Sequence, residues 1–246
     1  MRDRYIRVGL NVLQERKYLR LCEITYTAEK NGTPEGAREV GDISASKWEL
    51  VQRTTRQVPL DRYQRTPAPL AVDSTEICAF LSRGNESFLI LVAQYRPPLD
   101  AVVIEFPAGL IDPGEDAKVA ALRELKEETG YSACVEDVFD VSDAVCLEPG
   151  LSDSCCQFVK IRVDGDSKIN CKPQPQLDDG EDIDVILLPL KLGKNVESDV
   201  TPTKMLKRLV AQKEGMNNRT IVDARLYMFL EGLSFFKHTS LKIATL

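Results

Sequence analysis

The sequence contains a single histidine, and this scarcity limits the chemistry available to the chain. His238 lies near the C-terminal end of the 246 residues. A Ser-His-Asp triad, a Cys-His nucleophile pair or a histidine zinc site would have to be built around that one residue. Any hydrolytic chemistry is therefore expected to use carboxylates and a hard metal ion.

The cysteines lack the spacing of a metal site or of a closed disulfide framework. There are seven, an odd number, and none belongs to a C-x-x-C pair, although Cys155 and Cys156 are adjacent. We expect no secretory signal before them. The pattern predicts reduced thiols in an intracellular protein.

Long apolar runs and excess basic charge are also absent. No run approaches the roughly 20 apolar residues that span a bilayer, so no membrane segment is expected. The formal net charge of −6 argues against a broad nucleic-acid interface, which needs clustered basic surface. Residues 1–21 are rich in arginine, but Asp3 and Glu15 count against a transit peptide. We expect a solvated N-terminal arm and a cytoplasmic location, with a nuclear pool and mitochondrial import left open.

The chain is expected to have a small N-terminal β element and one larger domain. Alternating, β-branched segments at 20–28 and 47–55 predict strands separated by a long polar loop. The larger domain shows further strand patterns at 68–82, 88–96, 101–106, 133–141, 157–163 and 183–190, and helical patterns at 112–130, 203–213 and 220–236. We place the N-terminal β element in 1–64, the main domain in 65–237 and a tail in 238–246. This order predicts an α/β fold with a mixed sheet and helices on both faces.

The first of these helices combines an apolar stripe with crowded acidic residues. Val119 and Leu125 belong to the expected stripe, and Gly130 suits the helix end. Glu124 and Glu128, at i,i+4, repel each other at a cost of roughly 0.2–0.5 kcal/mol. Taken alone, such a cluster is most often a solvated acidic face. A divalent cation with oxygen ligands is the alternative that would relieve the repulsion.

The residues around this cluster favour the cation. They follow a pattern of G, five residues, E, seven residues, REU, one residue, EE, one residue and GU, in which U is apolar or aromatic. The positions are Gly109, Glu115, Arg123-Glu124-Leu125, Glu127-Glu128 and Gly130-Tyr131. This resembles the box of the Nudix hydrolases. The resemblance implies a Nudix α/β/α sandwich and Mg²⁺-dependent hydrolysis of a nucleoside diphosphate linked to another group.

Segments outside the box resemble the ADP-sugar pyrophosphatase branch, which hydrolyses ADP-ribose. They are "QYRPP" (94–98), "IEFPAGLID" (104–112), "AVCLEPGLSD" (144–153), "DGE" (179–181) and "VDAR" (222–225). Trp48 and "QRTTR" (52–56) resemble the N-terminal element of that branch. Pro149 lies further from the box than in the branch pattern, which indicates a short insertion. The resemblance therefore specifies the substrate less closely than it specifies the reaction.

The resemblance implies the metal site and the catalytic groups. The carbonyl of Ala108 and the carboxylates of Glu124, Glu128 and Glu115 would hold Mg²⁺, with Mn²⁺ as the alternative. Several such oxygens can hold more than one ion against a diphosphate.

Catalytic assistance is implied for three further residues. Glu127 and Arg123 would assist from the helix, where Arg123 could also pair with Glu127 across one turn. Glu181, in an Asp-Gly loop, would be the general base. The alternative for Glu181 is one more solvated acid in an acidic loop.

Substrate contacts are implied on both sides of the box. Arg96 and Arg53 suit phosphate oxygens. Trp48 would stack on adenine, although a core or interface role for this only tryptophan is nearly as plausible. In the family two N-terminal aromatics sandwich the base across a homodimer interface, and Tyr18 occupies the place of the first. The remaining implied substrate positions are Glu105, Gly109, Leu110, Leu147 and Glu148.

The sequence thus predicts a homodimeric ADP-sugar diphosphatase that converts ADP-ribose and water into AMP and ribose 5-phosphate. One alternative keeps the chemistry but acts on oxidised nucleoside diphosphates, dinucleotides or other nucleotide-sugars. Another alternative is a non-catalytic nucleotide sensor. The complete set of box carboxylates favours an enzyme, because a sensor has no need of all of them.

Overall fold

The computed structural model describes residues 4–29, 45–55, 71–190, 204–206, 208 and 219–238. The chain forms two compact units, one of residues 1–73 and 144–156, the other of residues 74–143 and 157–246. Most of the long polar loop and most of the helix expected at 203–213 lie outside the described residues. The boundaries near 64 and 237 expected from the sequence stay a proposal.

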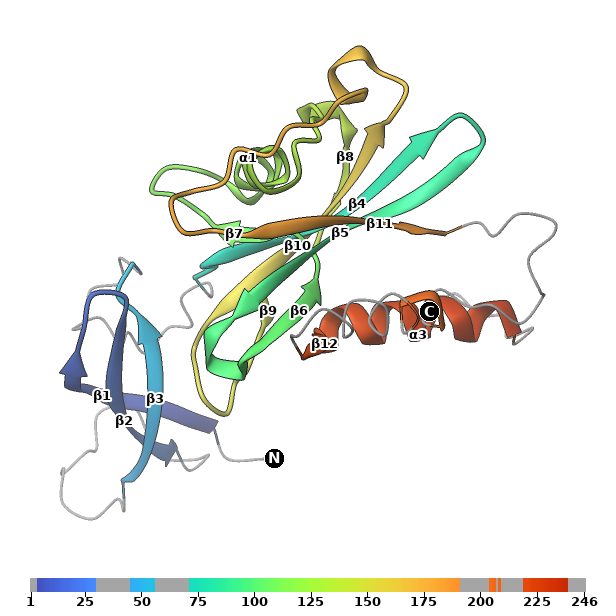
Figure 1. Cartoon of the computed structure of the whole chain (residues 1–246). Helices are drawn as coiled ribbons and strands as arrows, with labels where there is room; N and C mark the ends of the chain where they lie inside the picture. The colour runs from blue at the N-terminus through green and yellow to red at the C-terminus, as the bar shows by residue number, and fades with distance from the viewer. Residues whose placement is uncertain are drawn as a thin grey trace. The chain divides into compact units, whose positions relative to one another are not determined.

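The first unit contains a three-stranded antiparallel sheet in the order β1-β2-β3 (Figure 1). Its strands are β1 (Arg4–Glu15), β2 (Leu19–Glu29) and β3 (Ser46–Arg53). The two strands expected here are confirmed, but the expectation of a solvated N-terminal arm is wrong. The register of β1 against β2 shifts between Arg7 and Gly9 and between Val12 and Gln14. Such bulges interrupt the period of two by which a strand is recognised in sequence.

Most of the second unit is built on a nine-stranded mixed sheet in the order β12-β6-β5-β4-β10-β8, with β11 on β5, β7 on β4 and β9 on β10. Strands β12 and β6 form a parallel pair, whereas β5 pairs antiparallel with β4, β6 and β11. The first two residues of β10, together with β9, are grouped with the first unit. The strands are β4 (Ser74–Arg83), β5 (Glu86–Arg96), β6 (Ala101–Glu105), β7 (Ala108–Leu110), β8 (Val138–Val141), β9 (Val145–Cys146), β10 (Cys155–Asp164), β11 (Ile183–Pro189) and β12 (Thr220–Val222).

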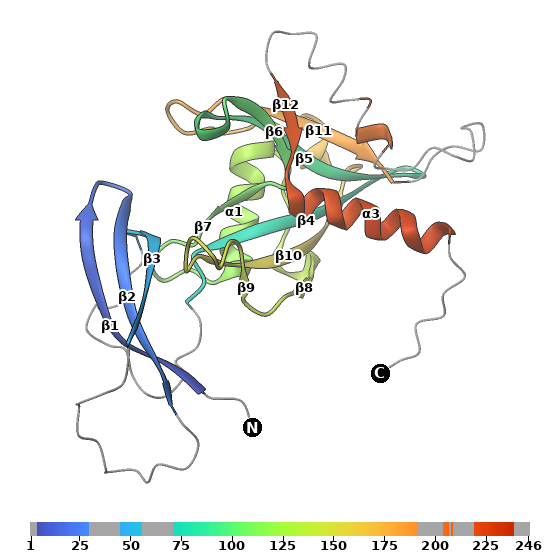
Figure 2. The same cartoon turned by 90° about the horizontal axis from the view of Figure 1, so that it is seen from below.

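Two helices, α1 (Ala117–Thr129) and α3 (Ala224–His238), cover opposite faces of this sheet (Figures 1 and 2). Strand β4 serves both faces, because successive side chains point to opposite sides. Ile77 and Leu81 belong to the core beneath α1, and Cys78 belongs to the core beneath α3. This arrangement confirms the α/β/α sandwich expected from the sequence.

Helix α1 packs through a different stripe from the one expected. Val119 is 46% exposed, so its assignment to the apolar stripe is wrong. The buried face instead carries Ala117, Ala121 and Leu125. Small alanines allow the helix backbone to approach the sheet closely. Glu128 is buried on this side of the helix as well.

Two other expected elements are shorter than predicted. The first three residues of the helix expected at 220–236 form β12, and α3 begins only at Ala224. In the strand expected at 133–141, a 3-10 turn (Val135–Asp137) precedes β8. Short 3-10 turns (Pro97–Leu99 and Lys168–Asn170) occur elsewhere in the unit. Of the helices in the described ranges, none has the length and apolar character to cross a bilayer.

Candidate active site

The site begins where the chain leaves β6 and turns into β7. Backbone contacts with β4 fix this turn: Ala108 lies opposite Glu76, and the N–H of Ile77 donates to the carbonyl of Pro107 at 2.8 Å. The segment then leads to Asp116, whose side chain accepts the N–H groups of Lys118 and Val119 and caps α1. The β7 backbone and the acidic residues of α1 therefore have defined positions in one unit.

Gly109 allows a carboxylate to lie directly against this backbone. A Cβ atom at Gly109 would come within 1.9 Å of Cδ of Glu124 and within 2.0 Å of its Oε1. No larger residue fits unless Glu124 moves. The glycine of the box thus has a steric role, since it brings the Glu124 carboxylate against β7.

Arg123 gathers the acidic residues around it. Its Nε and Nη2 donate to the two oxygens of Glu115 at 3.0 and 2.9 Å. Its Nη1 donates to Glu124 at 2.8 Å and to Glu127 at 3.0 Å, and Nη2 also reaches the carbonyl of Leu110 at 2.9 Å. The expected pairing of Arg123 with Glu127 is therefore present. These hydrogen bonds, first of all that to Glu115, raise the pKa of Arg123 and lower the pKa of Glu115.

Glu128 lies deeper than the other box carboxylates. It is 8% exposed, and its Oε2 accepts the N–H of Ala108 at 3.1 Å. Burial, together with the smaller effect of the nearby carboxylates Glu124, Glu181 and Glu105, raises the pKa of Glu128 to about 8, although the hydrogen bond from Ala108 opposes the shift. Burial also raises the pKa of Glu124, with Glu127 and Glu181 adding to it and Arg123 opposing it. Removing the repulsion would require positive charge beside Glu124 and Glu128.

Glu181 reaches this group from a loop. Its side chain accepts the N–H of Asp178 at 3.1 Å, in a turn where Gly180 has a φ of 90°. Its charge raises the pKa of both Glu124 and Glu128. The structure therefore brings Glu181 near the box carboxylates, more than fifty positions away along the chain.

The Glu181 loop is anchored on the end of α1. The N–H of Gln176 donates to the carbonyl of Glu127 at 2.7 Å. Gly130, at a φ of 74°, leaves no room for a Cβ, because that atom would come within 2.3 Å of the backbone nitrogen of Gln174. The second glycine of the box thus ends the helix and also lets this loop pack against it.

Arg96 and Glu105 form a second charged pair in the same unit. Arg96 donates through Nε and Nη2 to one oxygen of Glu105, at 2.8 and 2.7 Å. The Glu105 side chain is nearly buried, whereas that of Arg96 is 42% exposed. Burial raises the pKa of Glu105, and Arg96 opposes this shift. The carboxylate thus orients a guanidinium that solvent, or a ligand, can still reach.

The sequence analysis missed a partly buried network formed by Glu76, Asp223 and Arg225. Arg225 donates to Glu76 through Nη1 and holds Asp223 in a bidentate pair at 2.8 Å on each side. Asp223 also caps α3 by accepting the N–H of Arg225. Burial raises the pKa of Glu76 to about 7, which Arg225 opposes. A glutamate within the apolar run of β4 was the available signal, since a buried charge needs a partner.

The chemistry of these donors suits a divalent cation. Hard oxygen atoms from Glu115, Glu124 and Glu128 and the carbonyl of Ala108 are of the type that Mg²⁺ binds. In the described part of the chain, however, no three acidic, cysteine or histidine side chains are already arranged around one point as ligands. The contacts of Arg123 explain this, because it draws Glu115 and Glu124 toward itself.

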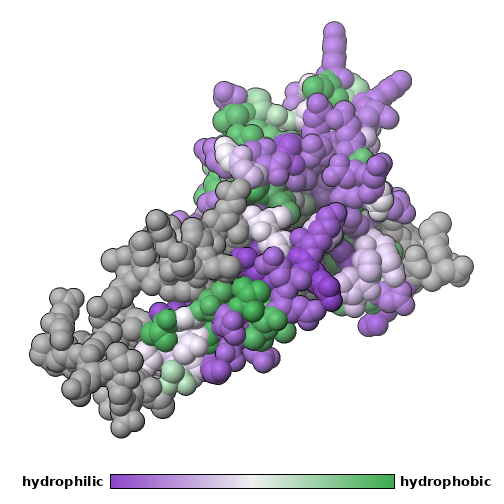
Figure 3. Space-filling view, turned by 90° about the vertical axis from the view of Figure 1, so that its left-hand side faces the viewer, coloured by the Kyte–Doolittle hydropathy of each residue, from purple (hydrophilic) through white to green (hydrophobic). Residues whose placement is uncertain are grey.

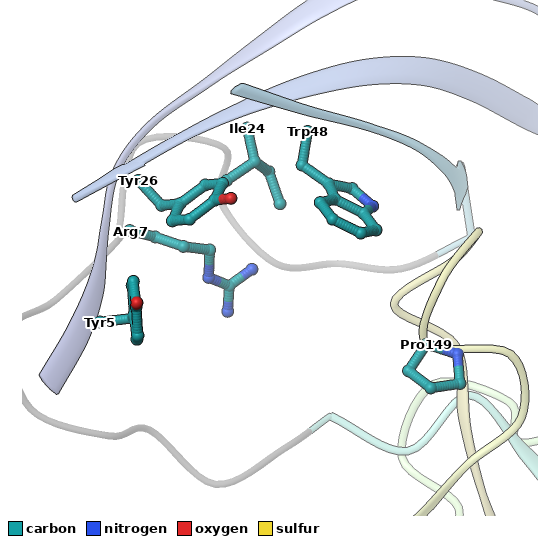
Figure 4. A pocket seen from close by; sticks show the side chains of 6 residues that line it. All are labelled: Tyr5, Arg7, Ile24, Tyr26, Trp48 and Pro149. Carbon is teal, nitrogen blue, oxygen red and sulfur yellow. The ribbon is translucent and has the colours of Figure 1, made fainter. Parts of the chain in front are cut away.

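The remaining substrate candidates belong to the first unit, where Trp48 lines a cavity of about 390 Å³. Trp48 is 50% exposed, so it is not a core residue. Tyr5, Arg7 and Tyr26 line the other side of the cavity, and Arg7 points into the space between them (Figure 4). The indole N–H of Trp48 donates to the carbonyl of Gly150 at 3.3 Å.

Tyr18 is far from Trp48 in the same sheet. Trp48 lies opposite Ile24, which is six positions along the chain from Tyr18, the residue just before β2. At about 3.4 Å per residue this is a separation of roughly 20 Å. One chain therefore does not bring the two aromatic side chains onto the same base.

The other first-unit candidates are exposed or partly exposed. Arg53 lies opposite Leu19, and the carbonyl of Tyr18 accepts the N–H of Thr54 at 3.1 Å. Glu148 is exposed, with its carbonyl accepting two N–H groups of the following turn, and Leu147 is partly buried. The relation of these residues to the carboxylates of the second unit is part of the proposal below.

Comparison with known proteins identifies the family. Residues 72–195 match the model of the NUDIX domain. The chain belongs to the Nudix hydrolase family, and it is therefore an enzyme of this type. The family needs a divalent metal ion.

Individual relatives agree with this assignment. The chain is 36% identical to the ADP-sugar pyrophosphatase of Mus musculus over 208 residues, which cover 81% of this chain and 86% of the relative. It is 33% identical to the ADP-ribose pyrophosphatase of Saccharomyces cerevisiae over 215 residues, 84% of this chain and 85% of the relative. The resemblance to the ADP-sugar pyrophosphatase branch is thus confirmed.

A solved structure supports the fold. A crystal structure of an ADP compounds hydrolase matches 96% of this chain and 97% of its own chain, with a TM-score of 0.52. Because the two sequences are only 17% identical, this likeness concerns the fold alone.

Proposed function

We propose that this protein hydrolyses the diphosphate of ADP-sugars, chiefly converting ADP-ribose and water into AMP and ribose 5-phosphate. The observation that carries the proposal is the position of Glu124 and Glu128 against the Ala108–Gly109 backbone, where burial and, to a smaller extent, like charges raise the pKa of both. A carboxylate group of this kind is stabilised by a cation. The names of the relatives support ADP-sugars as the substrate class.

Mg²⁺ is the proposed cation, held by Ala108, Glu124, Glu128 and Glu115. When bound, it supplies positive charge to the diphosphate oxygens and favours ionisation of a water molecule. Arg123 positions the ligands, because its hydrogen bonds fix Glu115 and Glu124. Glu127 shares these hydrogen bonds and assists beside the ligands.

Glu181 is the proposed general base. It is exposed on a turn near Glu124 and Glu128, so it can approach a water at the diphosphate and accept its proton. The anchoring of its loop on α1 keeps the base at the edge of the carboxylate group. Arg96, oriented by Glu105, is proposed to bind a phosphate oxygen, as an arginine fork suits such an anion. Gly109 and Leu110, on β7, would lie beside the substrate.

Base recognition is proposed to need two copies of the chain. Trp48 of one copy and Tyr18 of the other would stack on adenine, since one chain holds these residues about 20 Å apart. Arg53, Leu147 and Glu148 would complete the substrate contacts from the first unit.

An exposed apolar surface supports such a homodimer. On strand β2 the side chains of Arg20 and Cys22 are buried, whereas those of Leu19 and Leu21 are exposed. A sheet face in contact with water would normally carry polar side chains instead. Leu13 on β1 is exposed as well. Figure 3 shows a group of apolar residues in the lower half of the face that it displays. Light scattering is expected to give twice the mass of the 27.5 kDa chain. A monomeric mass at micromolar concentration would contradict the dimer.

A substrate panel tests the reaction. ADP-ribose, other nucleotide-sugars, dinucleotides and oxidised nucleoside diphosphates should be compared with Mg²⁺, with Mn²⁺ and with a chelator, using phosphate release after phosphatase coupling. We expect the highest kcat/KM for ADP-ribose, and we expect no turnover of any substrate when the chelator is present. Calorimetric binding of ADP-ribose without turnover would favour a sensor. A cytoplasmic location, without nucleic-acid or membrane partners, belongs to the proposal.

A further inference from the structure

Two cysteines lie directly opposite each other at the base of the loop between β9 and β10. In this antiparallel pair Cys146 is the partner of Cys155. The N–H of Leu147 donates to the carbonyl of Ser154 at 3.1 Å, so residues 147 and 154 form a hydrogen-bonded pair. Because the two kinds of pair alternate in antiparallel sheets, Cys146 and Cys155 form the non-hydrogen-bonded kind.

The backbone of Cys155 supports this assignment independently. Its N–H donates to Oδ2 of Asp73 at 3.0 Å, and its carbonyl accepts the N–H of Asp73 at 2.9 Å. Both groups therefore point away from β9. In a non-hydrogen-bonded pair the Cα atoms are about 4.5 Å apart and the side chains share a face. This lies within the range of about 4.4–6.8 Å that a disulfide spans.

The other cysteines have no comparable geometry in the described strand pairings. Cys156 lies opposite Val145 and, as the neighbour of Cys155, points to the opposite face. Cys134 and Cys171 are exposed, but both lie in the second unit. Cys146 is exposed, so a reagent in solution can reach it, whereas Cys155 is 4% exposed.

We propose that Cys146 and Cys155 are a site of reversible disulfide formation by a low-molecular-weight disulfide such as oxidised glutathione. The Cys146 thiolate attacks one sulfur of that disulfide and releases one glutathione thiolate. The Cys155 thiolate then attacks the Cys146 sulfur of the mixed disulfide and releases the second. Two protein thiols are thereby oxidised, and oxidised glutathione gains the two electrons and two protons. A separation near the lower limit of the range predicts a strained bond that thiols readily reduce.

The bond would close the neck of the loop 147–154. This loop already contacts β3, since Val51 N–H donates to the carbonyl of Leu151 at 2.8 Å and Gln52 Nε2 donates to Asp153 at 2.7 Å. The loop begins directly after β9, which is only two residues long. A covalent link at this short strand would prevent the neck from opening. The inference concerns the first unit and does not depend on the proposed substrate.

Peptide mapping of the full chain tests the site. The protein is incubated with oxidised glutathione, its remaining thiols are blocked with N-ethylmaleimide, and it is cleaved with a protease that cuts before aspartate, which can cut between Ser152 and Asp153. We expect a peptide pair joined through Cys146 and Cys155, lost on later treatment with reduced glutathione. Cys146→Ser should abolish it, and Cys134→Ser, a matched exposed control, should leave it intact.

Two results would overturn the inference. One is Cys146 carrying glutathione without a link to Cys155, and the other is a predominant link between different cysteines. Hydrogen exchange gives a second measurement: amides in 147–154 should exchange several-fold more slowly in the oxidised wild type, and oxidant should have no such effect on Cys146→Ser. Unchanged exchange in mapped, oxidised protein would refute closure of the loop neck.

Discussion

The carboxylate site of the second unit and the aromatic cavity of the first unit differ in the kind of side chain that they present to a ligand. The former places Glu124 and Glu128 where burial and like charge raise the pKa of both. The latter places a half-exposed Trp48 beside Tyr26 and Arg7 in an accessible cavity. The charge of the carboxylate site suits reaction at a phosphate, whereas the aromatic surface of the cavity suits recognition of a base that does not react. Substitutions in the two regions should therefore affect different kinetic constants.

The largest effect is expected for Glu128→Gln. This change keeps the size of the side chain but removes the deepest charge of the site, so kcat should fall by about a thousandfold or more. The melting temperature should hold or rise, because repulsion from Glu124 and Glu181 disappears. Steady-state kinetics and thermal unfolding measure both quantities. Glu86→Gln, which changes an exposed glutamate at the start of β5, is the control, and near-normal turnover of Glu128→Gln would exclude Glu128 as a ligand.

Glu181→Gln should have the next largest effect. Loss of a general base costs roughly 10²–10⁴-fold, and here it should appear in kcat with little change in KM. Because the side chain is exposed on its turn, stability should be nearly unchanged. The neighbouring Asp179→Asn is the matched control. Equal activities of the two variants would mean that Glu181 is only one more solvated acid.

Trp48→Ala tests the aromatic region. Stacking of an aromatic ring on a base contributes roughly 1–3 kcal/mol, so kcat/KM for ADP-ribose should fall by about ten- to a hundredfold. Most of the loss should be in KM, since adenine is remote from the bond that breaks. Trp48→Phe should recover much of it. A large fall in melting temperature with an unchanged KM would assign Trp48 a structural role instead.

The smallest effect concerns the stability of the metal-free protein. The pKa of Glu128 is about 8 in the folded state, against 4.5 for an unperturbed glutamate. Between these values the folded state holds a proton that the unfolded state releases. The free energy of unfolding should therefore fall as pH rises through this window, by at most about 1.4 kcal/mol per pH unit from this group.

Urea unfolding in the presence of a chelator, at about pH 6 and pH 8, measures this slope. Glu128→Gln should flatten it, and saturating Mg²⁺ should reduce it because a cation favours the ionised form. Part of the slope should survive in Glu128→Gln, since the pKa of Glu76 is also raised, to about 7. An identical slope in the variant and the wild type would mean that Glu128 ionises normally in the folded protein.

Much of the carboxylate site could be predicted from the sequence because its parts are local. Glu124, Glu127 and Glu128 share one helix, and the i,i+4 spacing alone places two of them on one side. Gly130 was expected at the helix end, and Gly109 was expected only as a fixed position of the box. What spacing could not show was that a Cβ at Gly109 would meet Glu124 and that one at Gly130 would meet Gln174, because these contacts join separate elements.

The sequence by itself determined the family, the longer strands of the main sheet and the residues of the acidic helix, since each depends on short-range periodicity or fixed spacing. The tertiary structure decided that residues 4–15 pair as β1, that Val119 faces solvent, and that Arg225 joins Glu76 across 149 positions. It also decided that Tyr18 and Trp48 lie apart and that Cys146 faces Cys155. The physical reason is that pairing register and packing bring together residues that are distant in the chain, and no local pattern records those partners.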